Sequence, residues 1–219
     1  METTKPTYKV SPTMLSTFAD SKVEKWGRGL GQWLQELVEG TPENEAMQLG
    51  SFVHYYMEHG EPAPQNENPA GWNLSEYALP ILDNLRTRTT DWEKEQKVRI
   101  EIKDFENYNV VLSMRVDVSS KVEKTIIDYK TTRSNTRPSI RWYNDSPQIK
   151  AYSLIGGYDR GEYCVLKLDM NEREIVDVVP YTFAFSLYPH HADEVKQLIK
   201  EMIDFVIYNG YQDFILFNQ

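Results

Sequence analysis

The spacing of apolar residues along the chain changes near residue 95. Before that point, apolar residues recur every three or four positions, which is the period of an amphipathic helix. Ser11 is placed as the N-cap of a first helix that begins at Pro12, because Pro suits the first helical position. The polar, proline-rich segment 61–71 predicts a long loop. Further helices are predicted over residues 33–38, 43–60 and 75–88.

After residue 95, short apolar runs rich in Val, Ile and Tyr predict strands. The first three are separated by short polar turns, so we expect an antiparallel meander. A helix, two more strands and a final amphipathic helix follow, which indicates an α/β fold with a central mixed sheet flanked by helices. The predicted strands are 97–105, 108–120, 124–132, 162–170 and 174–185, and the predicted helices are 146–157 and 190–208.

A chain of 219 residues is long enough for one substantial core. We therefore expect one domain over 1–219, with a mainly helical part over 1–94 and a sheet core with a C-terminal helix over 95–219. The formal net charge of −9 argues against a general nucleic-acid coat protein. It does not exclude a nucleic-acid enzyme, because carboxylates that hold metal ions count as negative in this sum.

Cysteine content and hydropathy exclude several other classes. The single cysteine, Cys164, rules out an internal disulfide, a zinc knuckle and a four-cysteine iron–sulfur cluster. No apolar run approaches the roughly 20 residues that span a bilayer, and the N-terminus lacks the apolar core of a secretory signal. We therefore expect a cytoplasmic protein without a membrane partner.

The stretch TIIDYKTTR places an acid and a lysine two residues apart at the end of a predicted strand. Asp128 and Lys130 then point to one face, and Tyr129 points to the other. Asp117 lies within a strand dominated by Val and Leu, where a carboxylate is costly unless it is paired. A turn returns the chain antiparallel, so Asp117 can lie beside Asp128. Either the acid and lysine form an exposed ion pair, or the three groups form a site for Mg²⁺ or Mn²⁺ and a phosphate, which we favour.

Two helical pairs supply further candidates. Gly50 and His54 stand four apart, and a glycine lets another backbone or a substrate approach the helix closely. His54 is either a metal ligand or a half-buried packing residue. Gln148 and Tyr152 also stand four apart, and they either contact a phosphate or base, or serve as a capping glutamine and a half-buried tyrosine.

Taken in order, these motifs resemble the RecB-type branch of the PD-(D/E)XK nuclease superfamily. Gly50-x-x-x-His54, Asp117, Asp128-Tyr129-Lys130 and Gln148-x-x-x-Tyr152 carry the resemblance, together with the opening VSPTMLSTFADS. Each motif is weak singly, and the combination in the expected order is specific. Many relatives hold an iron–sulfur cluster through four cysteines, and this chain lacks that set.

The resemblance implies a restriction-endonuclease-like core with an N-terminal helical elaboration. It implies that His54, Asp117, Asp128 and the carbonyl of Tyr129 hold Mg²⁺ or Mn²⁺, and that Lys130 orients the attacking water and stabilises the developing charge. Asp117, Asp128 and Lys130 are therefore the expected catalytic residues.

The expected substrate is DNA, as single strands or frayed ends, and the expected activity is exonucleolytic. Phage and mobile-element members of the family act in recombination or repair, so a recombination or replication protein is a candidate partner. Alternatives are a structure-specific endonuclease and a non-catalytic nucleic-acid-binding subunit. Arg133, Arg137 and Arg141 follow the catalytic strand and are expected to bind flanking phosphates, while Trp142 and Tyr143 either stack on bases or pack inward.

Overall fold

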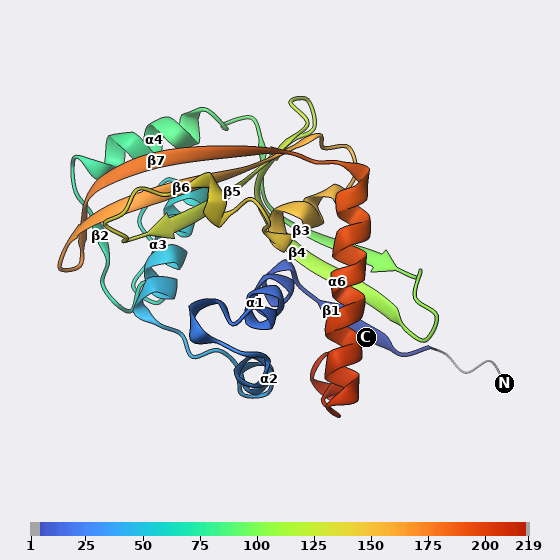
Figure 1. Cartoon of the computed structure of the whole chain (residues 1–219). Coiled ribbons are helices and arrows are strands. Elements are labelled where there is room, and N and C mark those ends of the chain that lie inside the picture. Colours follow the sequence, from blue (N-terminus) through green and yellow to red (C-terminus); the bar gives the residue numbers. More distant parts are fainter. Residues whose placement is uncertain (1–4, 218–219) are drawn as a thin grey trace.

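The computed structural model describes residues 5–217, in which a mixed seven-stranded sheet carries helices on both faces (Figure 1). The strands are β1 (Thr7–Val10), β2 (Asn73–Leu74), β3 (Glu93–Ile102), β4 (Asn109–Ser120), β5 (Thr125–Thr132), β6 (Arg160–Asn171) and β7 (Glu174–Ser186). The helices are α1 (Pro12–Lys22), α2 (Leu30–Glu39), α3 (Glu45–His59), α4 (Ala78–Thr87), α5 (Pro147–Ala151) and α6 (Pro189–Tyr208).

The predicted meander is confirmed. β3 pairs antiparallel with β4, and β4 pairs antiparallel with β5. β6 then lies parallel to β5, because the connection through α5 crosses over one face of the sheet, and β7 returns antiparallel to β6. The mixed α/β fold that the apolar pattern indicated is therefore the fold observed.

The sheet forks along one edge of β4. β3 follows the opposite edge of β4 from Ile102 to Glu93. On the forked edge, β1 pairs with residues 109–112 and β5 pairs with residues 118–120. Residues 113–116 between them pair with β3 alone. Along this opening Arg115 is exposed, whereas Met114 and Val116 are buried on the other face, and the candidate site lies here.

Two apolar clusters hold the helices against the sheet. One contains residues of α1, α5 and α6, and the other contains residues of α3 and α4. On α6, buried residues recur at helical spacing, and each contributes about 1.5–3 kcal/mol relative to exposure. These residues are Val195, Ile199, Met202, Ile203 and Val206. The two clusters fix the helices that supply side chains to the site.

The start of the first helix agrees with the sequence, since the Ser11 hydroxyl accepts from the Met14 N–H at 3.2 Å. β1 and β2 were not predicted, because strands of four and two residues are too short to show a pattern. The helix expected from Ser75 begins at Ala78, because the Ser75 hydroxyl caps the Ala78 N–H while its backbone N–H bonds β7. Over residues 5–217, no helix has the length and apolar character needed to span a bilayer.

Candidate active site

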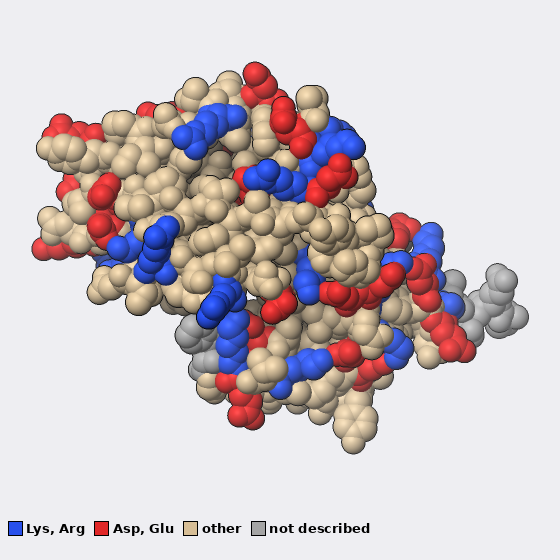
Figure 2. All heavy atoms as spheres, turned by 45° about the horizontal axis from the view of Figure 1, so that its top comes forward, with Lys and Arg blue, Asp and Glu red and all other residues tan. Residues whose placement is uncertain are grey.

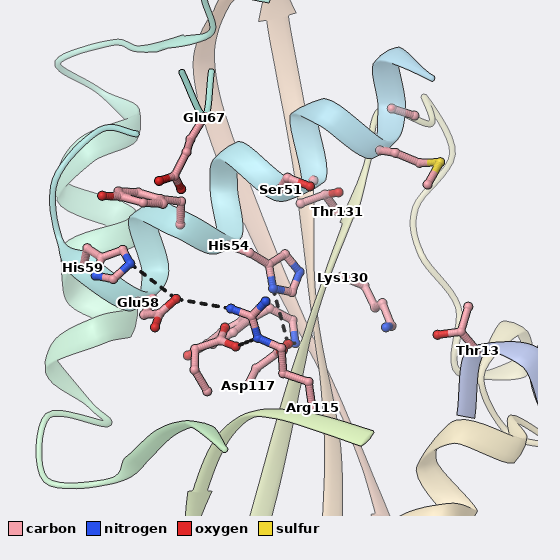
Figure 3. Close-up of a pocket in the computed structure, with 16 residues that line it drawn as sticks. Thr13, Ser51, His54, Glu58, His59, Glu67, Arg115, Asp117, Lys130 and Thr131 are labelled. Atoms are coloured by element: carbon pink, nitrogen blue, oxygen red, sulfur yellow. Dashed lines mark hydrogen bonds and ion pairs between the residues drawn. The ribbon is translucent and has the colours of Figure 1, made fainter. Parts of the chain in front are cut away.

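A cleft of about 810 Å³ opens beside the fork. Residues of α3 form one wall, and residues of β3, β4 and β5 form the floor. Figure 3 shows the His54 ring directed at Asp117, while Thr13 at the start of α1 lies on the far side of Lys130. The cleft therefore brings together groups from segments that are far apart in the sequence.

Asp117 sits where the β4–β5 ladder stops. The last pair before the fork is Val118 with Ile127, and Asp117 Oδ2 instead accepts the Tyr129 N–H at 2.7 Å. His54 Nδ1 lies 3.5 Å from the same oxygen. Burial, followed by the Asp128 carboxylate, raises the pKa of Asp117 to about 6, although His54 and the Tyr129 N–H act in the opposite direction. A cation at this point would relieve both unfavourable effects.

Asp128 is held in a fixed orientation and is only 2% exposed. Its Oδ2 accepts from Gln148 Nε2 at 2.5 Å and from the Tyr152 hydroxyl at 2.6 Å. Its Oδ1 lies 2.7 Å from Lys130 Nζ and has no further partner within residues 5–217. The contact with Lys130 is therefore a close ion pair, and Oδ1 accepts no hydrogen bond from the backbone of these residues.

Lys130 shares the face of Asp128, as the two-residue spacing predicted. Its Nζ also donates to Gln148 Oε1 at 3.1 Å. The Tyr129 side chain is 3% exposed and lies in the apolar cluster under α3 and α4, on the other face, again as predicted. The lysine is thus positioned by an acid and an amide at the edge of the cleft.

A metal ion fits the donor set at the cleft. One ligand atom each from His54, Glu95 and Asp117 lie within 4.8 Å of one another. On one Mg²⁺ at about 2.0–2.1 Å, opposite ligands are about 4.2 Å apart and adjacent ligands about 3 Å, so separations of up to 4.8 Å would have to shrink by up to about 2 Å for the three atoms to share one ion. Asp128 is not among these three residues and does not line the cleft, although it forms an ion pair with Lys130, which does. An imidazole among carboxylates suits Mn²⁺ as well as Mg²⁺.

Glu95 was missed by the sequence reasoning. Lys94 pairs with Val118 and Gln96 with Val116, which places Glu95 opposite Asp117. Its φ of 51° is left-handed within a strand, a conformation that costs of order 1–3 kcal/mol for a residue with a side chain. Nothing in the local sequence marks this acid, because charged residues alternate along the exposed face of β3.

Gly50 has the role expected of a glycine on a closely packed face. A Cβ at this position would lie 3.3 Å from Thr131 Oγ1, which is tighter than ordinary van der Waals contact. The small residue therefore lets α3 approach the end of β5, and this approach brings His54 over Asp117.

Other expected substrate-binding residues lie in different surroundings. Tyr152 is 1% exposed, and its hydroxyl donates to Asp128 and does not line the cleft. Burial, followed by the Asp128 charge, raises the pKa of Tyr152, so the hydroxyl keeps its proton and remains a donor. Arg133 forms an ion pair with Glu45, and the Arg137 guanidinium lies 5.4 Å from the Tyr181 ring centroid.

Arg141 and Trp142 are exposed, and neither lines the cleft of about 810 Å³. Tyr143 packs inward, with its ring stacked on Phe183 at a centroid distance of 5.7 Å. Of the two interpretations of the aromatic pair, inward packing therefore holds for Tyr143.

A mixed sheet that forks beside clustered acids and a lysine is the arrangement of a restriction-endonuclease-like nuclease fold. Comparison with solved structures finds this fold in several proteins of low sequence identity, and three of these illustrate the similarity. An exonuclease candidate from Eubacterium rectale matches with 13% identity and a TM-score of 0.55, over 93% of this chain and 82% of that chain. The protein SSO0001 matches with 15% identity and a TM-score of 0.53, over 93% and 79%.

LHK-Exo, an alkaline exonuclease from Laribacter hongkongensis solved in complex with dAMP, matches with 11% identity and a TM-score of 0.50, over 92% of this chain and 89% of that chain. The chain therefore shares the fold of these proteins, with an α/β restriction-endonuclease-like core, as the sequence resemblance implied. No protein-family model and no curated protein sequence matches the chain.

Proposed function

We propose that this protein is a metal-dependent DNA exonuclease that acts on single strands or frayed ends in recombination or repair. The observation that carries the proposal is the convergence of Asp117, Asp128 and Lys130 at the fork of the sheet. The exonucleases that share the fold support the same class of reaction. The proposed unit is the whole chain acting as one nuclease domain.

The proposed metal set combines His54, Asp117 and Asp128 with Glu95, and the Tyr129 carbonyl remains a candidate from the family resemblance. Bound Mg²⁺ or Mn²⁺ would supply Lewis acidity toward a phosphodiester and a water of lowered pKa. Among the described residues, no cysteine lines the cleft, and Ser51, which does, has no side-chain hydrogen bond to a histidine or carboxylate that could activate it, so the proposed reaction is direct hydrolysis.

Lys130 acts on the reacting groups directly in this proposal. Its ammonium lies at the edge of the cleft, where it can orient the attacking water and offset charge that develops on the phosphate oxygens. Gln148 bridges Lys130 and Asp128, so it positions both groups at once. Tyr152 donates to Asp128 from the buried side and is assigned a positioning role.

The walls of the cleft favour entry by a free end. α3 stands on one side and Thr13 of α1 on the other, so a strand in the cleft has protein on both sides. A thin flexible strand enters such a passage more easily than a stiff duplex, which is roughly 20 Å wide, as its groove dimensions imply. Threading requires an end, which is the reason for proposing exonuclease action.

The test compares linear and covalently closed circular single-stranded DNA of one sequence, with Mn²⁺, with Mg²⁺ and with EDTA. We expect metal-dependent release of nucleotides from the linear strand and little cutting of the circle. Lys130→Ala should slow release by about 10²–10⁴-fold, while substitution of Lys124, an exposed lysine at the β4–β5 turn, by alanine should leave the rate unchanged. Equal rates on both substrates would establish an endonuclease, and no cleavage with either metal would establish a non-catalytic role.

A further inference from the structure

A second groove adjoins the cleft on the side away from α3. It has a volume of about 830 Å³, and it shares Thr13 and Arg115 with the cleft. The described residues that line it include four cations and no acid. These cations are Lys9, Lys97, Arg99 and Arg115. Such a lining is unusual in a chain of net charge −9.

The ladder between β3 and β4 explains why the cations lie next to the metal ligands. Glu95 lies opposite Asp117, and the next pair on the same face is Lys97 with Arg115. The pair after that is Arg99 with Ser113. Along one face of this two-stranded ribbon, acids for a metal are therefore followed directly by cations. β1 joins the ribbon beyond this point and adds Lys9.

Three of these cations are free to bind a ligand. Lys9, Lys97 and Arg99 are exposed, and each lacks an ion pair within residues 5–217. By contrast, Arg115 contacts Glu95 and Glu58, and many other basic side chains are paired with acids. Figure 2 shows this intermingling of positive and negative side chains on one face of the molecule, without a broad basic surface there.

The spacing of the cations matches a nucleic-acid backbone. Alternate residues of a strand are about 6.8 Å apart. At this separation, the long side chains of Lys97 and Arg99 can reach neighbouring phosphates of one extended strand. Ser11 and Thr13 add hydroxyl donors along the same groove, and hydroxyls are common partners of phosphate oxygens.

We propose that the groove lined by Lys9, Lys97 and Arg99 binds the phosphates of the DNA strand that flank the one being cleaved. The strand runs from the metal site along the β3–β4 ribbon toward β1. This inference rests on the proposed nuclease function for its orientation, and it replaces Arg133, which is paired with Glu45, as the main phosphate contact. Backbone contacts of this type position a strand without reading its sequence.

The test measures binding of a fluorescent single-stranded oligonucleotide in EDTA, where hydrolysis is blocked. The groove variant is Lys9→Gln, Lys97→Gln and Arg99→Gln together. The matched control is Lys121→Gln, Lys124→Gln and Lys200→Gln, which lie outside the groove on the β4–β5 turn and α6. Both triple variants change the net charge from −9 to −12 (three cations removed from −9), so the comparison isolates position from total charge.

Each phosphate contact on a single strand contributes about 0.7 to the slope of log affinity against log salt, or about fivefold in affinity at 0.1 M salt. We expect the groove variant to bind up to about 100-fold more weakly, with a slope smaller by about 2. The control should stay within about threefold of the wild type. Equal losses in the two variants, or wild-type affinity in the groove variant, would overturn the proposal.

The outcome separates this proposal from the proposed function. If the wild type binds the oligonucleotide through the groove but cleaves nothing in Mn²⁺, the nuclease function is wrong and the phosphate-binding groove stands. If the groove variant retains metal-dependent cleavage with an unchanged KM, the nuclease function stands and the phosphate-binding groove is wrong. If the triple variant melts at a lower temperature, Lys97→Gln and Arg99→Gln are tested singly, with an expected loss of about fivefold each.

Discussion

Asp117→Asn tests whether the site is built to bind a metal ion, whose charge would offset the cost of ionising Asp117 in the folded protein. The pKa of Asp117 is raised from 3.8 to about 6, first by burial and second by Asp128. One pKa unit corresponds to about 1.4 kcal/mol, so the ionised carboxylate costs the metal-free fold about 3 kcal/mol at most. The asparagine keeps an oxygen for the Tyr129 N–H but loses the charge in that contact. A net gain of about 1–2 kcal/mol is therefore expected.

The sign of the pH dependence follows from the direction of the shift. Because the pKa of Asp117 is higher in the folded state, the fold binds the proton more tightly than the unfolded chain does. The cost of this group is therefore absent below pH 3.8 and grows until the pH has passed about 6. The advantage of Asp117→Asn over the wild type should be large at pH 8 and smaller by roughly 2 kcal/mol at pH 4.5.

The assay is urea unfolding of both proteins in EDTA at the two pH values. Asp91→Asn is the control, because Asp91 is exposed and forms no ion pair among the described residues. Adding Mn²⁺ at pH 8 should reverse the order, since a metal that binds only the folded state stabilises the wild type more. An Asp117→Asn protein that is no more stable than the wild type in EDTA at pH 8 would refute the reasoning.

Four further variants probe the site. Lys130→Ala should lower kcat by about 10²–10⁴ with little change in Tm, which steady-state kinetics and thermal melting would show. His54→Ala should lower the ratio of Mn²⁺ to Mg²⁺ activity, and an unchanged ratio would mean that His54 only packs. Glu95→Gln should weaken Mn²⁺ binding in calorimetry, and full affinity would exclude Glu95 as a ligand. Gly161→Ala places a Cβ 2.9 Å from Ile149 of α5, so it should lower the free energy of unfolding in urea by about 1–3 kcal/mol. It should also reduce kcat, because α5 carries Gln148, which contacts Asp128 and Lys130. Wild-type stability would show that α5 adapts.

The sequence by itself determined the features that depend on near neighbours in the chain. The two-residue spacing placed Asp128 and Lys130 on one face of β5, since side chains alternate along a strand. Helical spacing did the same for Gln148 and Tyr152, which both reach Asp128. Gly50 indicated a close approach, because only a residue without Cβ permits one. Each of these inferences needs only the repeat of a helix or strand.

Only the tertiary structure decided which distant segments share the cleft. The four-residue strand β1 carries no periodic signal, and its pairing with β4 creates the fork at which Asp117 finds the Tyr129 N–H. Glu95 and Lys97 are ordinary charged residues in the sequence, and the register of β3 against β4 places one with the candidate metal ligands and the other in the basic groove. Register is set by the packing of a whole sheet face, so a one-residue slip would have turned both side chains to the core. Local pattern therefore specified the longer elements and the strand that carries Asp128 and Lys130, while long-range packing selected the partners that complete the candidate site.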